Sequence, residues 1–167
     1  MMPPKGGCLN DLTHVDEHGN ARMVDVSKKE ITERLAVAHG VIAMGAAAMA
    51  AVVQRTAKKG DVLGVAQLAG IQAAKRTGEW IPLCHPLPLT SVDVVLVAEP
   101  ETGHVSCTAT VRTVGRTGVE MEAMVAVSAA LLTVYDMLKA VDRSMEIGAV
   151  KLMHKSGGRS GTWSRSA

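Results

Sequence analysis

The chain has 167 residues, of which 47 % are hydrophobic and 20 % are charged, so it has the size of about one domain and is too apolar to be disordered throughout. Its 18 basic and 16 acidic side chains give a formal net charge of only +2, which excludes a sequence-independent DNA-binding protein. Aromatic residues make up 2 %, too few for the stacking surfaces of a protein that binds single-stranded nucleic acid.

The N-terminal part of the chain predicts a mobile segment, two strands and a helix. Residues 1–11 are rich in Pro and Gly and are expected to be mobile. Ala21–Val26 is a short apolar strand candidate. The apolar residues of Thr32–Met44 fit alternation about as well as a helical pattern, and we favour a strand because Gly40 weakens a helix. The Ala-rich stretch Ala46–Ala57 predicts a helix.

A second helix and an irregular loop follow. Asp61 is a typical N-cap residue, and the helix behind it is expected to run through Thr77, with Gly78 just past its end. Ile81–Leu89 holds three prolines, which exclude regular structure there. The longest apolar stretch, Val41–Val53, is shorter than the ~20 residues of a membrane span, so no membrane association is expected.

The C-terminal half predicts a hairpin, a long helix and a last strand. Apolar and polar residues alternate in Thr90–Ala98 and again in His104–Val114, and the turn Pro100–Gly103 joins the two strands. Glu120–Val141 is a long apolar helix, and Met145–Met153 predicts the final strand.

This order of elements is typical of a ferredoxin-like α+β fold, an antiparallel sheet with helices packed on one face. Residues 12–161 contain no linker and are expected to form a single domain, followed by a mobile tail at 162–167 that ends the Gly/Ser-rich stretch Lys155–Ala167. Three widely spaced cysteines, Cys8, Cys84 and Cys107, indicate neither a disulfide framework nor a zinc site. Free thiols and the lack of a signal peptide predict a cytoplasmic protein.

Two loop positions are candidates for chemistry. Lys59 lies two residues before Asp61, so its ammonium can lie beside a helix N-terminus, where anions are favoured. The simpler interpretation is a basic helix end followed by an N-cap residue. Cys84 and His85 stand between prolines that fix their position, and His85 suits either acid–base catalysis or a structural hydrogen bond.

The long helix carries charges at both ends. Glu120 and Glu122 lie in its first turn, where the helix dipole alone would explain carboxylates. Asp136 and Lys139 are spaced i, i+3 near the other end. Such pairs are usually surface salt bridges, but a charge pair on so apolar a helix also indicates a functional site.

The segment Lys155–Gly161 combines glycines, hydroxyl groups and two cations, which suits either a polyphosphate site or a solvated tail. His14 and His18 are spaced four apart, but nothing else supports a metal there, and we expect no metal site.

Seven segments in this order resemble the cyclic pyranopterin monophosphate synthase family, MoaC, which acts in molybdenum cofactor biosynthesis. They are LTHVDEHGNARMVDVS (Leu12–Ser27), KGDV (Lys59–Val62), AGIQAAKRT (Ala69–Thr77), IPLCHPL (Ile81–Leu87), TGVEMEA (Thr117–Ala123), YDMLKAVD (Tyr135–Asp142) and KSGGRSG (Lys155–Gly161). Each segment alone is a weak signal, but together they span nearly the whole chain.

The resemblance implies a lyase that converts (8S)-3',8-cyclo-7,8-dihydroguanosine 5'-triphosphate to cyclic pyranopterin monophosphate and diphosphate. It implies a ferredoxin-like homohexamer, a trimer of dimers. No cofactor is implied beyond a Mg²⁺ ion that can accompany the triphosphate. The catalytic residues that it implies are Asp136, Lys139, Lys59 and His85, and the substrate-binding residues are Leu83, Cys84, His85, Glu120, Met121, Glu122 and Lys155.

The length of the last predicted helix separates two of these motifs. Glu120 and Asp136 are sixteen residues apart, so their Cα atoms would be about 24 Å apart and point to nearly opposite faces. If both serve one nucleotide, they come from different subunits. We also expect Lys59 and Asp136 to enter one pocket from two different chains. A small-ligand-binding regulatory module remains the alternative to an enzyme, because the fold alone does not decide function. An RNA-binding module is disfavoured by the lack of aromatic residues on the hairpin.

Overall fold

The structure is a computed structural model that describes Asp16 and residues 18–166. The predicted mobile segment 1–11 and His14 lie outside the described residues.

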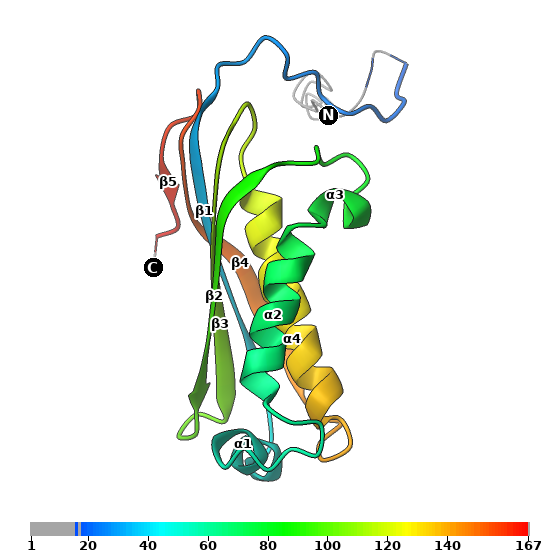
Figure 1. Ribbon diagram of the computed structural model, residues 1–167, viewed down its shortest axis with the longest axis vertical. Helices are drawn as coiled ribbons and strands as arrows, with labels where there is room; N and C mark the ends of the chain where they lie inside the picture. Colours follow the sequence, from blue (N-terminus) through cyan, green and yellow to red (C-terminus); the bar gives the residue numbers. More distant parts are fainter. Residues whose placement is uncertain (1–15, 17, 167) are drawn as a thin grey trace, which may run out of the picture.

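A five-stranded antiparallel sheet forms one layer of the molecule (Figure 1). The strand order is β2-β3-β1-β4-β5, and its first four strands have the ferredoxin-like order that the sequence predicted. The strands are β1 (Thr32–Ala43), β2 (Leu89–Glu99), β3 (His104–Gly115), β4 (Glu146–Ser156) and β5 (Trp163–Ser164).

Two long helices cover one face of this sheet and form the second layer (Figure 1). They are α2 (Val62–Ala74) and α4 (Glu120–Leu138), whereas α1 (Ala46–Val53) and α3 (Thr77–Trp80) are short and lie at opposite ends of the molecule. The close approach of α4 to the sheet explains a glycine within β1: a Cβ atom at Gly40 would lie 2.8 Å from Cγ1 of Val127. Helices on one face confirm the predicted α+β arrangement.

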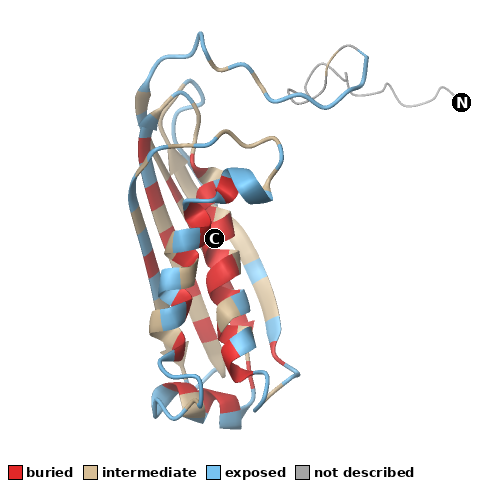
Figure 2. Ribbon diagram, turned by 45° about the vertical axis from the view of Figure 1, so that its right-hand side comes forward, coloured by how far each residue is buried: buried red, intermediate tan, exposed pale blue. Residues whose placement is uncertain are grey.

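The core lies between the helices and the sheet, as the buried residues in Figure 2 show. Alternate residues of β1, among them Ala36, Ala38 and Ile42, are fully buried against α4. The helix α4 is long and apolar enough to cross a membrane by length and composition, but 61 % of its most apolar window is buried inside the protein. Its apolar surface is therefore that of a core helix.

One predicted strand is absent, and the first predicted helix is too long. Residues Ala21–Val26 contain only an isolated bridge at Ala21 and form no strand. The first helix stops at Val53, before Arg55, whose φ of 53° is left-handed and cannot continue a helix. It therefore ends four residues earlier than the predicted Ala57.

The second helix ends at Ala74, and α3 follows it separately. The buried Thr77 hydroxyl donates to the carbonyl of Ala74 at 3.0 Å and satisfies this helix end. The prediction that Gly78 follows the end of a single helix is therefore wrong, because Gly78 lies inside α3. The long helix also ends earlier than predicted, at Leu138, with Lys139 as its C-cap residue.

Candidate active site

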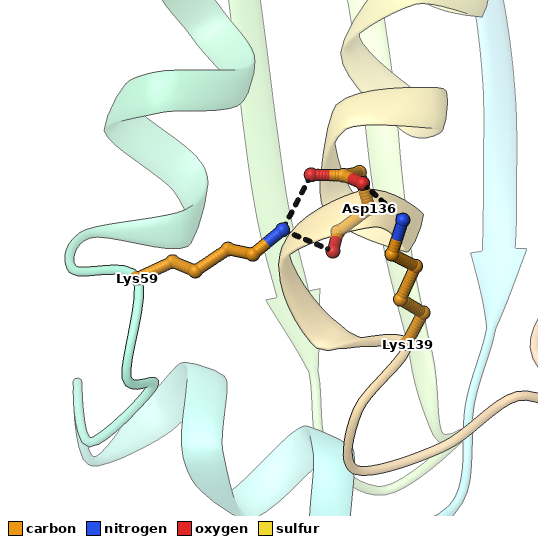
Figure 3. A network of polar contacts seen from close by, with 3 residues as sticks. All are labelled: Lys59, Asp136 and Lys139. Carbon is orange, nitrogen blue, oxygen red and sulfur yellow. Dashed lines mark hydrogen bonds and ion pairs between the residues drawn. The ribbon is translucent and has the colours of Figure 1, made fainter.

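Three charged side chains meet at the C-terminal end of α4; we call Lys59, Asp136 and Lys139 the aspartate cluster (Figure 3). The Lys59 ammonium donates to Oδ2 of Asp136 at 2.6 Å and to the Asp136 carbonyl at 2.9 Å. Lys139 Nζ lies 2.7 Å from Oδ1 of the same carboxylate. The predicted i, i+3 pair is therefore present, and a lysine from 77 residues away completes it.

The two ammonium groups keep Asp136 ionised. Hydrogen bonds from Lys139, and then from Lys59, lower the pKa of this carboxyl to about 2. About half of each side chain is exposed, so solvent screens the pairs and a ligand can reach them. The cluster offers a proton-accepting carboxylate beside two proton donors and carries one net positive charge.

The loop between α1 and α2 positions Lys59. A left-handed turn at Gly60, with φ 97°, precedes Asp61, whose Oδ1 accepts from the Gly64 amide at 3.1 Å. The predicted N-cap is thus confirmed. Lys59 extends sideways from this capped helix start to α4 of the same chain (Figure 3). Our expectation that Lys59 and Asp136 come from opposite chains is therefore wrong, because a single chain already joins them.

A second site lies at the other end of the molecule; we call it the cationic pocket. Its volume is about 670 Å³. Six basic residues line it: Lys28, Lys29, Arg34, Arg116, Lys155 and Arg159. Only Glu30 and Glu120 among the lining residues are acidic. A pocket with this excess of cations suits a polyphosphate.

Sequence reasoning singled out Lys155 and the loop after it but missed Lys28, Lys29, Arg34 and Arg116. One signal was available for Arg34. It precedes Ala36 by two residues, so the alternation of β1 places it on the helix-facing side, where a charged residue is unexpected.

The structure corrects the setting of Lys155. It lies in β4, opposite Ala36 of β1, and not in a flexible tail. Its ammonium contacts the Ser160 hydroxyl in the loop that leads to β5. Lys155 therefore reaches the cationic pocket from a strand, and only Gly158, Arg159 and Ser160 reach it from the following loop.

A smaller pocket of about 240 Å³, which we call the Cys84 pocket, adjoins the cationic pocket. The two share Lys29, Thr117, Gly118 and Glu120 as lining residues. The Cys84 pocket contains the remaining predicted substrate-binding residues, namely Leu83, Cys84, His85, Glu120, Met121 and Glu122. The loop before β2 and the first turn of α4 therefore line the same pocket.

Burial sets the protonation of two groups in this pocket. Glu122 is only 4 % exposed, and desolvation raises the pKa of its carboxyl to about 7. Desolvation, and then the nearby Glu122 charge, also raises the pKa of the Cys84 thiol. Cys84 is thus a neutral thiol that lines the pocket rather than an activated nucleophile.

His85 has a defined orientation. Its Nε2 lies 2.8 Å from the carbonyl of Val24, which can only accept, so Nε2 carries a hydrogen. In the neutral ring, Nδ1 is then the nitrogen that takes up a proton. Val24, which was predicted to lie in a strand, instead accepts this bond from the loop before β2.

The predicted site residues thus form two groups within one chain. The Cys84 and cationic pockets lie at the N-terminal end of α4, and the aspartate cluster lies at its C-terminal end. Glu120 and Asp136 belong to one continuous helix, which puts their Cα atoms about 24 Å apart. Within the part of the chain that the structure describes, no three His, Cys, Asp or Glu residues form a metal-binding group.

Comparison with known proteins gives a consistent match. The profile of the MoaC family matches residues 23–158. A cyclic pyranopterin monophosphate synthase of Cereibacter sphaeroides (strain ATCC 17029 / ATH 2.4.9) is 56 % identical over 159 residues, covering 95 % of this chain and 100 % of that protein. Proteins with the same name from Rhodospirillum rubrum and Thermomicrobium roseum are 55 % and 57 % identical, covering 99 % and 94 % of this chain and 100 % and 95 % of their own lengths.

Proposed function

The chain belongs to the MoaC family, and we propose that it converts (8S)-3',8-cyclo-7,8-dihydroguanosine 5'-triphosphate to cyclic pyranopterin monophosphate and diphosphate, as a lyase of molybdenum cofactor biosynthesis. The observation that supports this most strongly is that the cationic pocket and the Cys84 pocket adjoin and share four lining residues. Together they offer separate places for a triphosphate and for a guanine-derived ring.

The chemistry of each pocket fits one part of this substrate. Cations of the cationic pocket can offset the charge that develops as a hydroxyl attacks the α-phosphorus and diphosphate leaves. In the Cys84 pocket, Glu120 and Glu122 present carboxyl oxygens, which accept hydrogen bonds from the adjacent N–H groups of a guanine edge. His85 lies beside them and can transfer protons through Nδ1.

The aspartate cluster supplies the remaining acid–base groups in this proposal. Ring opening and pyran closure need proton transfers, for which the Asp136 carboxylate and its two lysines are suited. Because one nucleotide does not span about 24 Å of helix, we infer that a partner subunit brings its cluster to the two pockets. This places the active site at a dimer interface, and we propose the trimer of dimers that the family resemblance implies.

We place the reaction in the cytoplasm, because the thiols of Cys84 and Cys107 are both free, as suits a reducing compartment.

The direct test is incubation of the purified protein with the cyclic substrate, with and without Mg²⁺, while diphosphate and the cyclic monophosphate product are quantified together. Equal amounts of the two products support the proposal. The Asp136→Asn variant is the control for a contaminating phosphatase, because it should form neither product. Tight substrate binding without turnover by the wild-type protein would instead identify a ligand-binding regulatory module.

A further inference from the structure

The guanidinium of Arg34 occupies the space that a side chain at position 158 would fill. A Cβ atom added to Gly158 would lie 1.6 Å from Nη1, 2.5 Å from Cζ and 2.8 Å from Nη2 of Arg34. Arg34 Nε also donates to the Gly115 carbonyl at 3.3 Å. The guanidinium is therefore held between a strand end and a loop with no side chain at the contact.

This contact lies in the wall of the cationic pocket, which both Arg34 and Gly158 line. The same loop holds a second cation of the pocket, because Ser160 contacts the ammonium of Lys155. Both cations project from strands, Arg34 from β1 and Lys155 from β4. The loop thus orients two long side chains that would otherwise sample many rotamers.

We propose that Gly158 is a positioning residue. Because it has no side chain, the Arg34 guanidinium can lie directly against it, in the orientation that lets Arg34 bind an anion in the cationic pocket. This inference rests on the proposed function and assigns a phosphate-binding role to one arginine of the site. A methyl group at position 158 would displace the guanidinium, which can move because it ends a flexible side chain. The result would be weaker anion binding with little change in the fold.

A rival explanation is that glycine is required at position 158 only for its backbone. Its φ of +69° is left-handed, and any other residue is strained there. Gly161 provides a matched control, since its φ is +61° and a Cβ added to it meets nothing within 4 Å. Gly161→Ala thus introduces a similar backbone strain without touching Arg34.

The experiment compares Gly158→Ala, Gly161→Ala, Arg34→Ala and the double variant Arg34→Ala/Gly158→Ala. Affinity for inorganic tripolyphosphate is measured by calorimetry at fixed ionic strength, and KM and kcat are measured with the cyclic substrate. We expect Gly158→Ala and Arg34→Ala each to weaken tripolyphosphate binding and raise KM by about tenfold or more, the loss for one charge-assisted contact. Gly161→Ala should change both less than about twofold, and Gly158→Ala should add nothing in the Arg34→Ala background.

The outcomes separate this inference from the proposed function. Equal losses in Gly158→Ala and Gly161→Ala, or a full additional loss in the double variant, would overturn the positioning role while leaving the enzyme assignment intact. A wild-type protein that binds tripolyphosphate through Arg34 but forms no product would contradict the proposed function alone. If Gly158→Ala does not fold, the double variant Arg34→Ala/Gly158→Ala should fold with the Tm of an Arg34→Ala/Gly161→Ala protein. The reason is that the double variant lacks the guanidinium with which the methyl group at position 158 would clash. If the double variant does not reach that Tm, the positioning role of Gly158 is refuted.

Discussion

Two inactive variants should restore each other's activity if the pocket is shared between subunits. Glu120→Ala removes a carboxylate common to the Cys84 and cationic pockets, and Asp136→Asn removes the base of the aspartate cluster. The two residues lie at opposite ends of α4, which is continuous from Glu120 to Leu138. A helix of this length separates them by about 24 Å and does not fold back to unite them.

The expected recovery follows from counting pockets. In a mixed dimer, one pocket combines both lesions and the other combines none. Random pairing after denaturation and refolding of an equal mixture makes half of the dimers mixed, each with one intact pocket of two. The ceiling is therefore about a quarter of wild-type activity when the sites are independent. Activity is measured as diphosphate release, with each variant refolded alone as the baseline.

The structure supplies an internal control for this experiment. Lys59 is bound to Asp136 of its own chain at 2.6 Å, so Lys59→Ala and Asp136→Asn damage the same cluster. A mixture of these two variants should stay inactive, because every pocket receives a cluster with one lesion. No recovery from Glu120→Ala with Asp136→Asn, when the refolded dimers have formed, would refute the shared pocket. Recovery from the Lys59 mixture would show that the cluster is not one catalytic unit.

Three further variants test single residues. Asp136→Asn alone should lower turnover by about 100-fold or more, the range of a lost acid–base group, while thermal unfolding stays unchanged because the side chain is half exposed; near-normal product formation would contradict its role. Glu122→Gln tests the buried carboxyl: because folding raises the pKa of Glu122 from 4.5 to about 7, the folded chain binds more protons, and wild-type stability should fall by about 3 kcal/mol as pH rises through this interval. The Gln side chain cannot ionise, so the Tm of the variant should rise relative to that of the wild type between pH 4.5 and pH 8. A Tm difference that does not change with pH would refute the raised pKa of Glu122. Asp61→Ala removes the cap on Gly64 and should lower stability by about 1 kcal/mol, read as urea midpoints, with Asp25→Ala as an exposed control outside any helix.

Much of the fold was predictable because its signals are local. The hairpin of β2 and β3 follows from apolar residues at every second position and a turn, and α4 follows from a long apolar run. The ambiguous Thr32–Met44 segment contains the strand β1, which confirms the prediction. The sequence did not show why Gly40 lies within this strand, because the reason is its close contact with Val127 of α4. The two-residue strand β5, missed from the sequence, exists only through pairing with His154 and Lys155 of β4.

The members of the aspartate cluster could be named from the sequence but not their grouping, whereas four basic residues of the cationic pocket were missed altogether. The motifs that carry the resemblance contain every residue of the aspartate cluster, but the sequence did not show that Lys59 crosses to α4 within one chain. Likewise Arg34 and Arg116 reach the cationic pocket from positions with no motif of their own. Such juxtapositions depend on strand register and helix placement, which are set by the whole fold.

Stability does not account for the aspartate cluster. Its side chains are about half exposed, and ion pairs of this kind contribute little to folding in water. Two lysines on one carboxylate also leave an uncancelled positive charge at the end of α4, which the fold does not need. That charge would be useful beside an anionic substrate, and the cationic pocket of the same chain lies at the far end of the helix. A second chain that brings the two ends together would therefore account for the cluster, and the mixed-refolding experiment tests this arrangement.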